Sequence, residues 1–253
     1  MDIYAYLERI QYSEPIKPDV QTLYGLQRAH LLHIPFENLD IVLKRPILLD
    51  RNALWEKIIL HQRGGFCYEL NGLFGWLLEE IGFVVTYLDA RVFNQEGKPG
   101  IEFDHLALLV QVPHRSRKWL ADVGFGDSFS EPLSFEGPQV QIQGLRSYRL
   151  EQTPDGYVTW QRNYDGSWER QYFFDIKPHN FPEEYLSGCT YHQTSPLSSF
   201  TRGSIISRAT PSGRVSLKDG WLILTEDGQR TKHPIQSRDE YQALLKKYFD
   251  VTL

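Results

Sequence analysis

The sequence predicts an α+β fold, in which helices come first and strands follow. Apolar residues recur at helical spacing through residues 1–83, whereas short β-rich runs separated by turn residues dominate from Val84 onward. The chain shows no regular alternation of strands and helices, which a doubly wound parallel sheet would require. We therefore expect a helical part followed by a largely antiparallel part.

The N-terminal part contains four expected helices. The first is a short amphipathic stretch from Asp2 to Ile10, and the second is capped by Asp19. A third is expected to be capped by Asn52, and a fourth to begin near Cys67 and end at Gly82. The fourth has the clearest helical period, which is carried by Leu70, Leu73, Phe74, Leu77, Leu78 and Ile81.

The remainder of the chain is expected to be strand-rich. The expected strands are 84–93, 105–112, 118–125, 147–151, 157–162, 169–174, 204–207, 214–217 and 221–225. The stretch 175–200 contains Pro178, Pro182 and Pro196, and we expect an irregular crossover there. A capping box at Ser237–Glu240 predicts a final helix that runs to about Tyr248.

Composition excludes several classes of protein. The 253 residues contain 27 Lys and Arg against 32 Asp and Glu, so the formal charge is −5 and no basic stripe indicates a nucleic-acid binder. No apolar run approaches the ~18 residues of a membrane span, and no secretory signal is visible. Two cysteines cannot form a disulfide framework. We expect a cytoplasmic protein with a free thiol.

Cys67 is the first candidate for a catalytic residue. It follows Gly64 and Gly65 and precedes the fourth expected helix. The first turn of a helix has unpaired N–H groups and partial positive charge, which favour a thiolate. The two glycines would let the chain turn sharply and let a substrate approach. Taken alone, such a cysteine is more often a small buried apolar residue.

His105 and Asp122 are the other two candidates for catalytic residues, and they support the interpretation of Cys67 as a nucleophile. His105 begins one apolar run and Asp122 lies in the next, and a short turn at 113–117 makes the two strands antiparallel neighbours. A buried Asp needs a hydrogen-bonding partner, and His105 is the candidate. Cysteine as nucleophile, histidine as base and aspartate as orienting group form the triad of acyl transfer. Together the three residues favour a catalytic site over three separate structural roles.

Two other functions stay open on these residues alone. A cysteine hydrolase or a transglutaminase-like amide-processing enzyme would use the same three residue types, with water resolving the acyl-enzyme. A non-catalytic binding module would carry an inert Cys67, and thiol titration would distinguish it. The pairs His30/His33 and Cys189/His192 have a possible metal spacing but no second ligand pair, and we expect no metal.

Several motifs together resemble the arylamine N-acetyltransferase family. They occur in the order of the family over residues 1–200. The most specific are Arg63-Gly64-Gly65-Phe66-Cys67 and Asp122-Val123-Gly124-Phe125-Gly126. The others are Met1-Asp2-Ile3, Tyr6-Leu7-Glu8-Arg9-Ile10, Ile34-Pro35-Phe36-Glu37-Asn38-Leu39, His105-Leu106 and Gln193-Thr194-Ser195-Pro196-Leu197-Ser198-Ser199-Phe200.

The resemblance implies an N-terminal helical bundle at 1–83, a central β-barrel at 84–188 and a C-terminal α/β lid at 189–253. It implies that Cys67, His105 and Asp122 form a triad arranged as in cysteine proteases. The implied reaction is ping-pong transfer of acetyl from acetyl-CoA, as co-substrate, to an arylamine, arylhydrazine or N-hydroxyarylamine. The family is associated with xenobiotic metabolism.

The resemblance also assigns contact residues. Phe36 and Phe125 are implied to contact the acceptor and Ser199 to contact coenzyme A. From their positions beside these motifs we also expect Phe66 at the acceptor and Gly126 at coenzyme A. Two departures concern the cofactor: Ile101-Glu102-Phe103-Asp104 stands where some members have Thr-Gly, and Leu197 stands where some have a cofactor-binding threonine. The partners that the resemblance implies are small molecules. Neither a nucleic acid nor a membrane is an expected partner.

Overall fold

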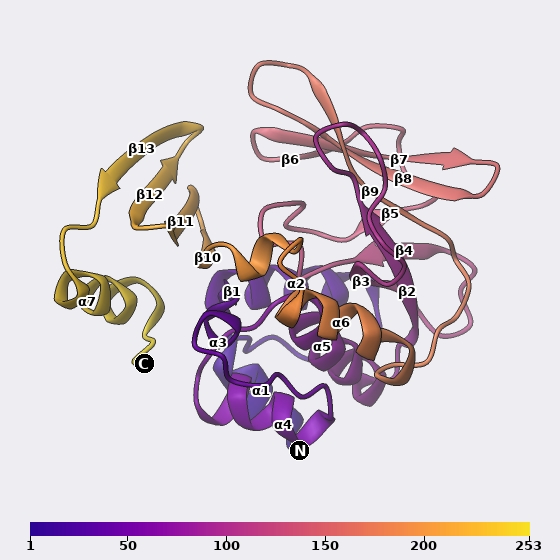
Figure 1. Cartoon of the computed structure of the whole chain (residues 1–253). Coiled ribbons are helices and arrows are strands. Elements are labelled where there is room, and N and C mark those ends of the chain that lie inside the picture. Colours follow the sequence, from indigo (N-terminus) through magenta and orange to yellow (C-terminus); the bar gives the residue numbers. More distant parts are fainter.

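The computed structural model describes residues 1–253 and begins with a group of helices (Figure 1). These are α1 (Ile3–Arg9), α2 (Val20–His33), α3 (Leu39–Val42), α4 (Arg51–Trp55), a π-helical turn (Glu56–Leu60) and α5 (Cys67–Ile81). The cap at Asp19 is confirmed, since its carboxylate accepts a hydrogen bond from the Thr22 amide, and Asp2 caps α1 in the same way through the Tyr4 amide. The cap at Asn52 is wrong, because the Asp50 carboxylate accepts from the amides of Asn52 and Ala53 instead.

An eight-stranded antiparallel sheet follows and curves into a nearly closed barrel. Its strand order is β5 (Leu133–Ser134), β4 (Lys118–Ala121), β3 (His105–Gln111), β2 (Val84–Val92), β9 (Trp168–Phe174), β8 (Gly156–Arg162), β7 (Arg146–Thr153) and β6 (Gln141–Gln143). The Gln141 side chain bridges the seam between the end strands: it accepts from the Ser134 amide at 2.8 Å and donates to the Ser134 carbonyl at 3.0 Å.

Helix α5 lies between the other N-terminal helices and the barrel. Every residue of α5 from Cys67 to Leu78 is buried. Strand β3 shows the two-residue period of a strand with apolar neighbours on both faces. Leu106, Leu108 and Val110 join the core around α5, whereas Ala107 and Leu109 join the core inside the barrel. The helix that begins at Cys67 is therefore held rigidly against the strand that begins at His105.

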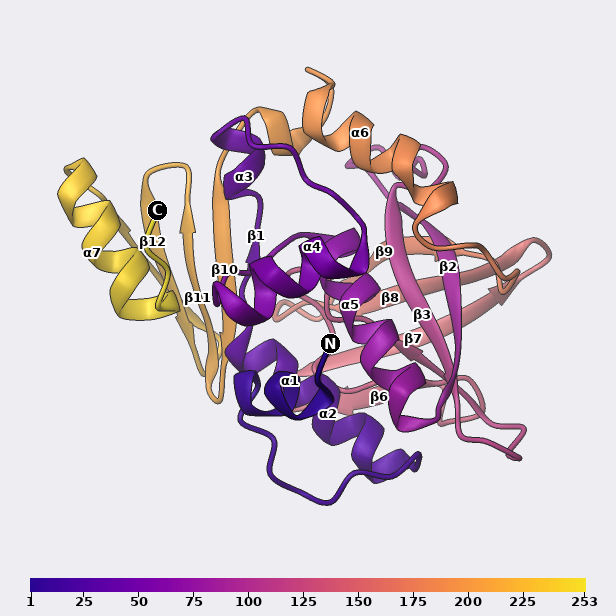
Figure 2. The same cartoon turned by 90° about the horizontal axis from the view of Figure 1, so that it is seen from below.

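A second, five-stranded antiparallel sheet contains β1 (Phe36–Glu37), β10 (Ile205–Thr210), β11 (Gly213–Lys218), β12 (Trp221–Glu226) and β13 (Gln229–Pro234). One face of this sheet is apolar and packs on α7 (Arg238–Phe249) through Ile206, Val215, Leu217, Leu245 and Phe249. Figure 2 shows α7 on the outer side of the C-terminal sheet, away from the barrel. The pairing of β1 with β10 ties residues 36–37 to this sheet.

The α+β class and the long helices are confirmed, but the stretch 175–200 differs from expectation. It contains α6 (Leu186–Thr194) between the prolines, so the expected boundary after residue 188 falls inside a helix. Sequence periodicity missed α6 because its residues form no apolar stripe. Strand β13 was missed because all six residues are exposed, which leaves no alternation to detect. No helix is both long and apolar enough to span a membrane.

Candidate active site

Cys67 is the first residue of α5, and its backbone is fixed by packing on both sides. The Phe66 amide donates to Oε2 of Glu69 at 3.1 Å, which anchors the first turn of the helix. A Cβ at Gly64 would lie 1.9 Å from the Pro35 carbonyl oxygen. The expectation that Gly64 opens a path for substrate is therefore wrong: the position is glycine because the chain packs directly on Pro35.

His105 and Asp122 lie side by side, as the strand pairing predicted. Strands β3 and β4 are antiparallel, with Leu108 opposite Ala121, so the residue after β4 is carried towards the start of β3. His105 Nε2 lies 2.7 Å from Oδ2 of Asp122, and both side chains are almost completely buried. Because Nε2 donates to the carboxylate, Nδ1 is the nitrogen that is free to accept a proton from a nucleophile.

The Asp122 carboxylate is held by donors from three further elements. Oδ1 accepts from Asn71 Nδ2 at 2.8 Å and from the Gly124 amide at 2.8 Å, while Oδ2 also accepts from the Tyr172 hydroxyl at 3.0 Å. Burial raises the pKa of Asp122, but the charge of His105 and these donated bonds outweigh burial and hold the pKa below its ordinary value. Asp122 is therefore ionised at neutral pH.

Gly124 lets the loop after β4 approach the nucleophile. A Cβ there would lie 2.7 Å from the Cys67 Cα and 2.8 Å from Asn71 Nδ2. A larger residue would push the loop away from α5 and separate Asp122 from its donors. The glycine is thus required by the close approach of two backbones.

One cavity of about 370 Å³ lies next to both candidate catalytic residues, Cys67 and His105. Cys67 and His105 both line it, and Asp122 lies behind His105. Phe36, Phe125 and Ser199 line the same cavity. The structure does not bring Phe66 there, because its ring is fully buried against Tyr68 and Phe200. Gly126 lines an adjoining groove on the other side of Phe125.

The environment of Cys67 acts on its pKa in two directions. Burial raises the pKa of the thiol, and the negative charges of Asp104 and Asp122 add to this, whereas a hydrogen bond from the Leu106 backbone lowers it. The position at a helix start, used above to predict a thiolate, is therefore not sufficient by itself. A thiolate here would need a cationic partner, and His105, which lines the same cavity, is the candidate.

Several residues that contact Asp122 or line the cavity were not predicted to belong to the site. Asn71 is a polar residue inside the apolar face of α5, one turn after Cys67, and that position was an available signal. Tyr172 comes from β9, and Phe200 and His192 line the cavity from the segment after the barrel. Nothing in the spacing of these three residues indicates the site, since their approach depends on the closure of the barrel and the position of α6.

The two residue pairs with a possible metal spacing, His30/His33 and Cys189/His192, make other contacts. His30 Nδ1 lies 2.7 Å from the Tyr6 hydroxyl, and His33 Nδ1 lies 2.8 Å from the Ala29 carbonyl oxygen. Sγ of Cys189 accepts from Gln193 at 3.2 Å, and His192 Nε2 lies 3.1 Å from Asp104 Oδ1. Each side chain is engaged in packing or hydrogen bonding with its neighbours.

Comparisons with known proteins agree with this geometry. A family model described as N-acetyltransferase matches residues 19–253. The arylamine N-acetyltransferase of Mycolicibacterium smegmatis is 36% identical over 92% of this chain and 85% of its own length. That of Escherichia coli K12 is 35% identical over 92% of this chain and 81% of its own length. The structure of Mycobacterium marinum arylamine N-acetyltransferase in complex with CoA superimposes with a TM-score of 0.91 at 30% identity, covering 99% of this chain and 93% of the other. The chain therefore belongs to the arylamine N-acetyltransferase family of acyltransferases.

Proposed function

We propose that this protein transfers acetyl from acetyl-CoA to an aromatic amine, hydrazine or hydroxylamine by a ping-pong reaction through acetyl-Cys67. The observation that carries the proposal is the shared cavity of Cys67 and His105, with His105 Nε2 at 2.7 Å from Asp122. The CoA complex of the M. marinum relative supports acetyl-CoA as the donor. The free thiols Cys67 and Cys189 suit a reducing, cytoplasmic setting.

In the first half-reaction, Nδ1 of His105 takes the Cys67 proton and the thiolate attacks the thioester carbonyl. Asp122 stabilises the imidazolium through Nε2. The Cys67 amide, at the first position of α5, is a donor for the developing oxyanion. The carbon–sulfur bond to coenzyme A then breaks, and the imidazolium returns its proton to the departing thiolate. An acetyl-cysteine remains on the enzyme.

In the second half-reaction, the amine nitrogen attacks the acetyl-cysteine carbonyl. His105 takes a proton from the nitrogen and delivers it to the departing Cys67 sulfur, so the products are an amide and the free enzyme. Phe36, Phe125 and Phe200 give the cavity aromatic walls, which suit the neutral ring of an arylamine. We assign Phe36 and Phe125 to the acceptor, and Ser199 and Gly126 to coenzyme A; Phe66 supports Phe200 from behind.

Mass spectrometry of the protein after incubation with acetyl-CoA tests the proposal. We expect one added acetyl group on Cys67, which disappears when an arylamine is added. Cys67→Ser should remove both the modification and turnover, because a serine hydroxyl is far less acidic than a thiol. Cys189→Ala is the matched control: burial raises the pKa of Cys189 to about 12, and the thiol lines no part of the catalytic cavity.

Two results would contradict the proposal. Acetylation of the Cys67→Ser protein at another residue would place the nucleophile elsewhere. Hydrolysis of the acetyl-enzyme at the same rate with and without arylamine would instead indicate a cysteine hydrolase.

A further inference from the structure

A second chain of hydrogen bonds, formed by Ser198, His192 and Asp104, lies on the wall of the catalytic cavity. All three residues line the cavity that Cys67 and His105 line. His192 Nδ1 lies 3.0 Å from the Ser198 hydroxyl, and His192 Nε2 lies 3.1 Å from Oδ1 of Asp104. Because Asp104 and His105 are consecutive, the segment that enters β3 supplies one residue to this chain and one to the triad.

The direction of these hydrogen bonds follows from their acceptors. His192 Nε2 faces only acceptors, namely the Asp104 carbonyl oxygen at 3.0 Å and the Asp104 carboxylate at 3.1 Å, so this nitrogen carries a hydrogen. Nδ1 of the neutral ring then accepts from the Ser198 hydroxyl, whose oxygen accepts from the Phe200 amide at 3.2 Å. Ser198 therefore fixes the tautomer in which His192 donates to Asp104.

Aromatic packing holds the His192 ring in this position. The ring is buried, with its centroid 5.2 Å from that of Phe200 and 6.1 Å from that of Tyr68. Tyr68, the second residue of α5, donates through its hydroxyl to the Asp104 carbonyl oxygen at 3.2 Å. Helices α5 and α6 thus meet at the residue that precedes His105.

Asp104 also has a structural role in the loop between β2 and β3. Its Oδ2 accepts from the Val92 amide at 3.0 Å, and the Val92 carbonyl oxygen accepts from the Gly100 amide at 2.9 Å. A Cβ at Gly100 would collide with Oδ2 of Asp104, so the loop closes directly onto the carboxylate. The fold therefore places a negative charge at the edge of the catalytic cavity.

The charge of Asp104 acts against a thiolate at Cys67. Burial raises the pKa of the Cys67 thiol, and among the neighbouring charges that of Asp104 raises it most. The other titratable side chains around the cavity and Asp104 are His105, Tyr68, Tyr191 and Arg202. None of these four bonds to the Asp104 carboxylate, so His192 is its one side-chain partner.

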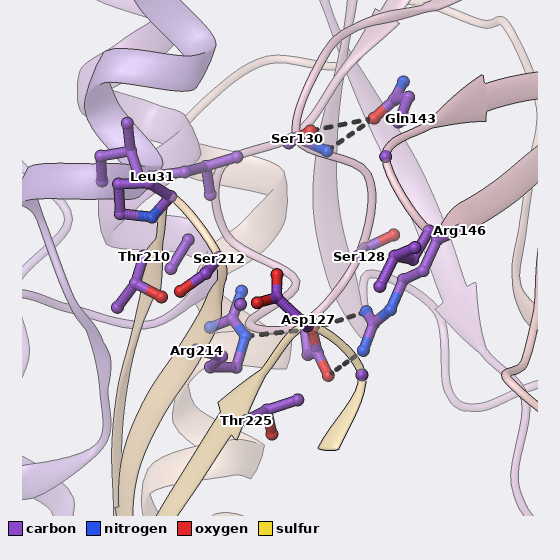
Figure 3. Close-up of a pocket in the computed structure, with 18 of the residues that line it drawn as sticks. Leu31, Asp127, Ser128, Ser130, Gln143, Arg146, Thr210, Ser212, Arg214 and Thr225 are labelled. Carbon is purple, nitrogen blue, oxygen red and sulfur yellow. Dashed lines mark hydrogen bonds and ion pairs between the residues drawn. The ribbon is translucent and has the colours of Figure 1, made fainter. Parts of the chain in front are cut away.

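A second carboxylate near the cavity shows how differently such a charge can be compensated. Oδ1 of Asp127 accepts from Arg146 Nη1 at 2.7 Å and from Arg214 Nε at 3.0 Å (Figure 3). Asp127 is thus paired with two guanidinium groups, whereas Asp104 has no Lys or Arg nitrogen within 4.0 Å. Asp104 depends on hydrogen bonds from His192 and a backbone amide instead.

We infer that His192 is a positioning residue that holds the Asp104 carboxylate and disperses its charge, and thereby keeps Cys67 reactive. The inference rests on the proposed role of Cys67 and adds a residue that acts on it through Asp104. Since His192 acts on the sulfur, it should affect the rate at which Cys67 reacts with any electrophile.

The test is the rate of Cys67 alkylation by iodoacetamide as a function of pH, with the modified residue located by mass spectrometry. His192→Leu leaves the Asp104 carboxylate without its side-chain donor, so the midpoint of the profile should move to higher pH. Alkylation at pH 7 should slow about fivefold. His192→Gln can still donate to Asp104 and should stay within about twofold of wild type. His114→Leu, in an exposed turn, is the control and should change nothing.

A second substitution separates the effect of charge from that of packing. Adding Asp104→Asn to His192→Leu removes the opposing charge, so alkylation at pH 7 should return to within about twofold of wild type or exceed it. A purely structural His192 predicts a further loss instead, because the loop loses another bond. Failure of this recovery, or an unchanged profile in folded His192→Leu protein, would overturn the inference.

Two further outcomes keep the inference separate from folding and from the proposed function. If His192→Leu does not fold, Asp104→Asn alone decides: its Oδ1 can still accept from His192, and the midpoint should move to lower pH. A midpoint that stays or rises would reject the role of the Asp104 charge. Because iodoacetamide replaces acetyl-CoA, these profiles hold even if acetyl-CoA never modifies Cys67, a result that would refute the proposed function alone.

Discussion

Nδ2 of Asn71 donates to Oδ1 of Asp122 at 2.8 Å, and this bond links the helix that begins at Cys67 to Asp122. The same Nδ2 donates to the Leu106 carbonyl oxygen at 2.6 Å, and Oδ1 of Asn71 accepts from the Val123 amide at 2.8 Å. One side chain of α5 therefore fixes both the start of β3 and the loop after β4. The three triad residues come from separate elements, and Asn71 holds these elements together.

Asn71→Ala should slow Cys67 acetylation at least about tenfold and lower the free energy of unfolding by about 1–3 kcal/mol, because three buried polar groups lose a partner. The loss of a donor should also raise the pKa of Asp122. Since the site needs the ionised carboxylate, the acid limb of the acetylation rate should move to higher pH. Asn163→Ala, in an exposed turn, is the control. A folded Asn71→Ala protein with wild-type rate and pH profile would contradict the assignment.

Asp122→Asn should weaken the stabilisation of the Cys67 thiolate by His105. Without the carboxylate the imidazolium loses its stabilisation, and we expect this loss to outweigh the removal of a negative charge that itself raises the pKa of the thiol. At pH 7 the rate of alkylation by iodoacetamide should fall at least about 10²-fold. In the variant the rate should continue to rise above about pH 8.5, the ordinary pKa of a thiol.

Asp155→Asn, at an exposed position, controls for the loss of a negative charge. The outcome that would reject the coupled pair is an unchanged alkylation profile in folded Asp122→Asn protein. Asp122 would then have a structural role alone.

Much of the order of elements and the pairing of His105 with Asp122 could be predicted from sequence because each has a local signal. The apolar period of α5, the glycine at its end and the short turn between β3 and β4 are properties of neighbouring residues. These local signals predict that a cysteine begins a helix. They also predict that a His and an Asp lie next to each other on adjacent strands. The contact between His105 and Asp122 is confirmed, whereas their roles in catalysis stay a proposal.

The surroundings of the triad could not be predicted in the same way. Tyr172 reaches Asp122 from 50 residues away, which requires the barrel to curve until β9 lies over the site. Phe66, next to Cys67 in sequence, points away from the cavity because it packs into the aromatic cluster with Tyr68 and Phe200. In the adjoining groove, Arg214 and Arg230 come close through the register of β11, β12 and β13, and the exposed β13 has no local pattern that could have indicated this.

His30 should limit stability in acid. Burial lowers its pKa from 6.5 to about 3, so the folded protein keeps it neutral while the unfolded chain protonates it below pH 6.5. Stability from this group is complete above pH 6.5 and is lost as the pH falls. The expected loss is about 1.4 kcal/mol per pH unit below about pH 6.

The measurement is urea unfolding at pH 7, 6 and 5 for wild type and for His30→Gln, whose side-chain oxygen can still accept from the Tyr6 hydroxyl. The variant should show a smaller fall in stability between pH 6 and pH 5. His61→Gln, at an exposed position, should fall in parallel with wild type. Parallel curves for wild type and His30→Gln would show that His30 does not titrate differently in the two states.

Phe125 should control which acceptor reacts and have little effect on acetylation. Its ring lines the catalytic cavity and lies edge-on to the His105 ring, with 5.4 Å between centroids. Phe125→Leu keeps an apolar side chain against His105 but removes the flat surface on which an acceptor ring would stack. We expect acetylation of Cys67 within about threefold of wild type, and a change of about 1–3 kcal/mol in the relative kcat/KM of bulky and small arylamines.

The two half-reactions are measured separately, with acetyl-enzyme formation followed by release of coenzyme A and acetyl transfer followed by loss of the acetyl-cysteine. Phe135→Leu is the matched control, because that ring packs in the barrel core against Tyr157 and lines neither the cavity nor the groove. If acetylation collapses in Phe125→Leu while the ranking of acceptors stays the same, the ring holds His105 in place and the acceptor wall must lie elsewhere. If the ranking alone changes, the wall shared by the cavity and the groove selects the acceptor.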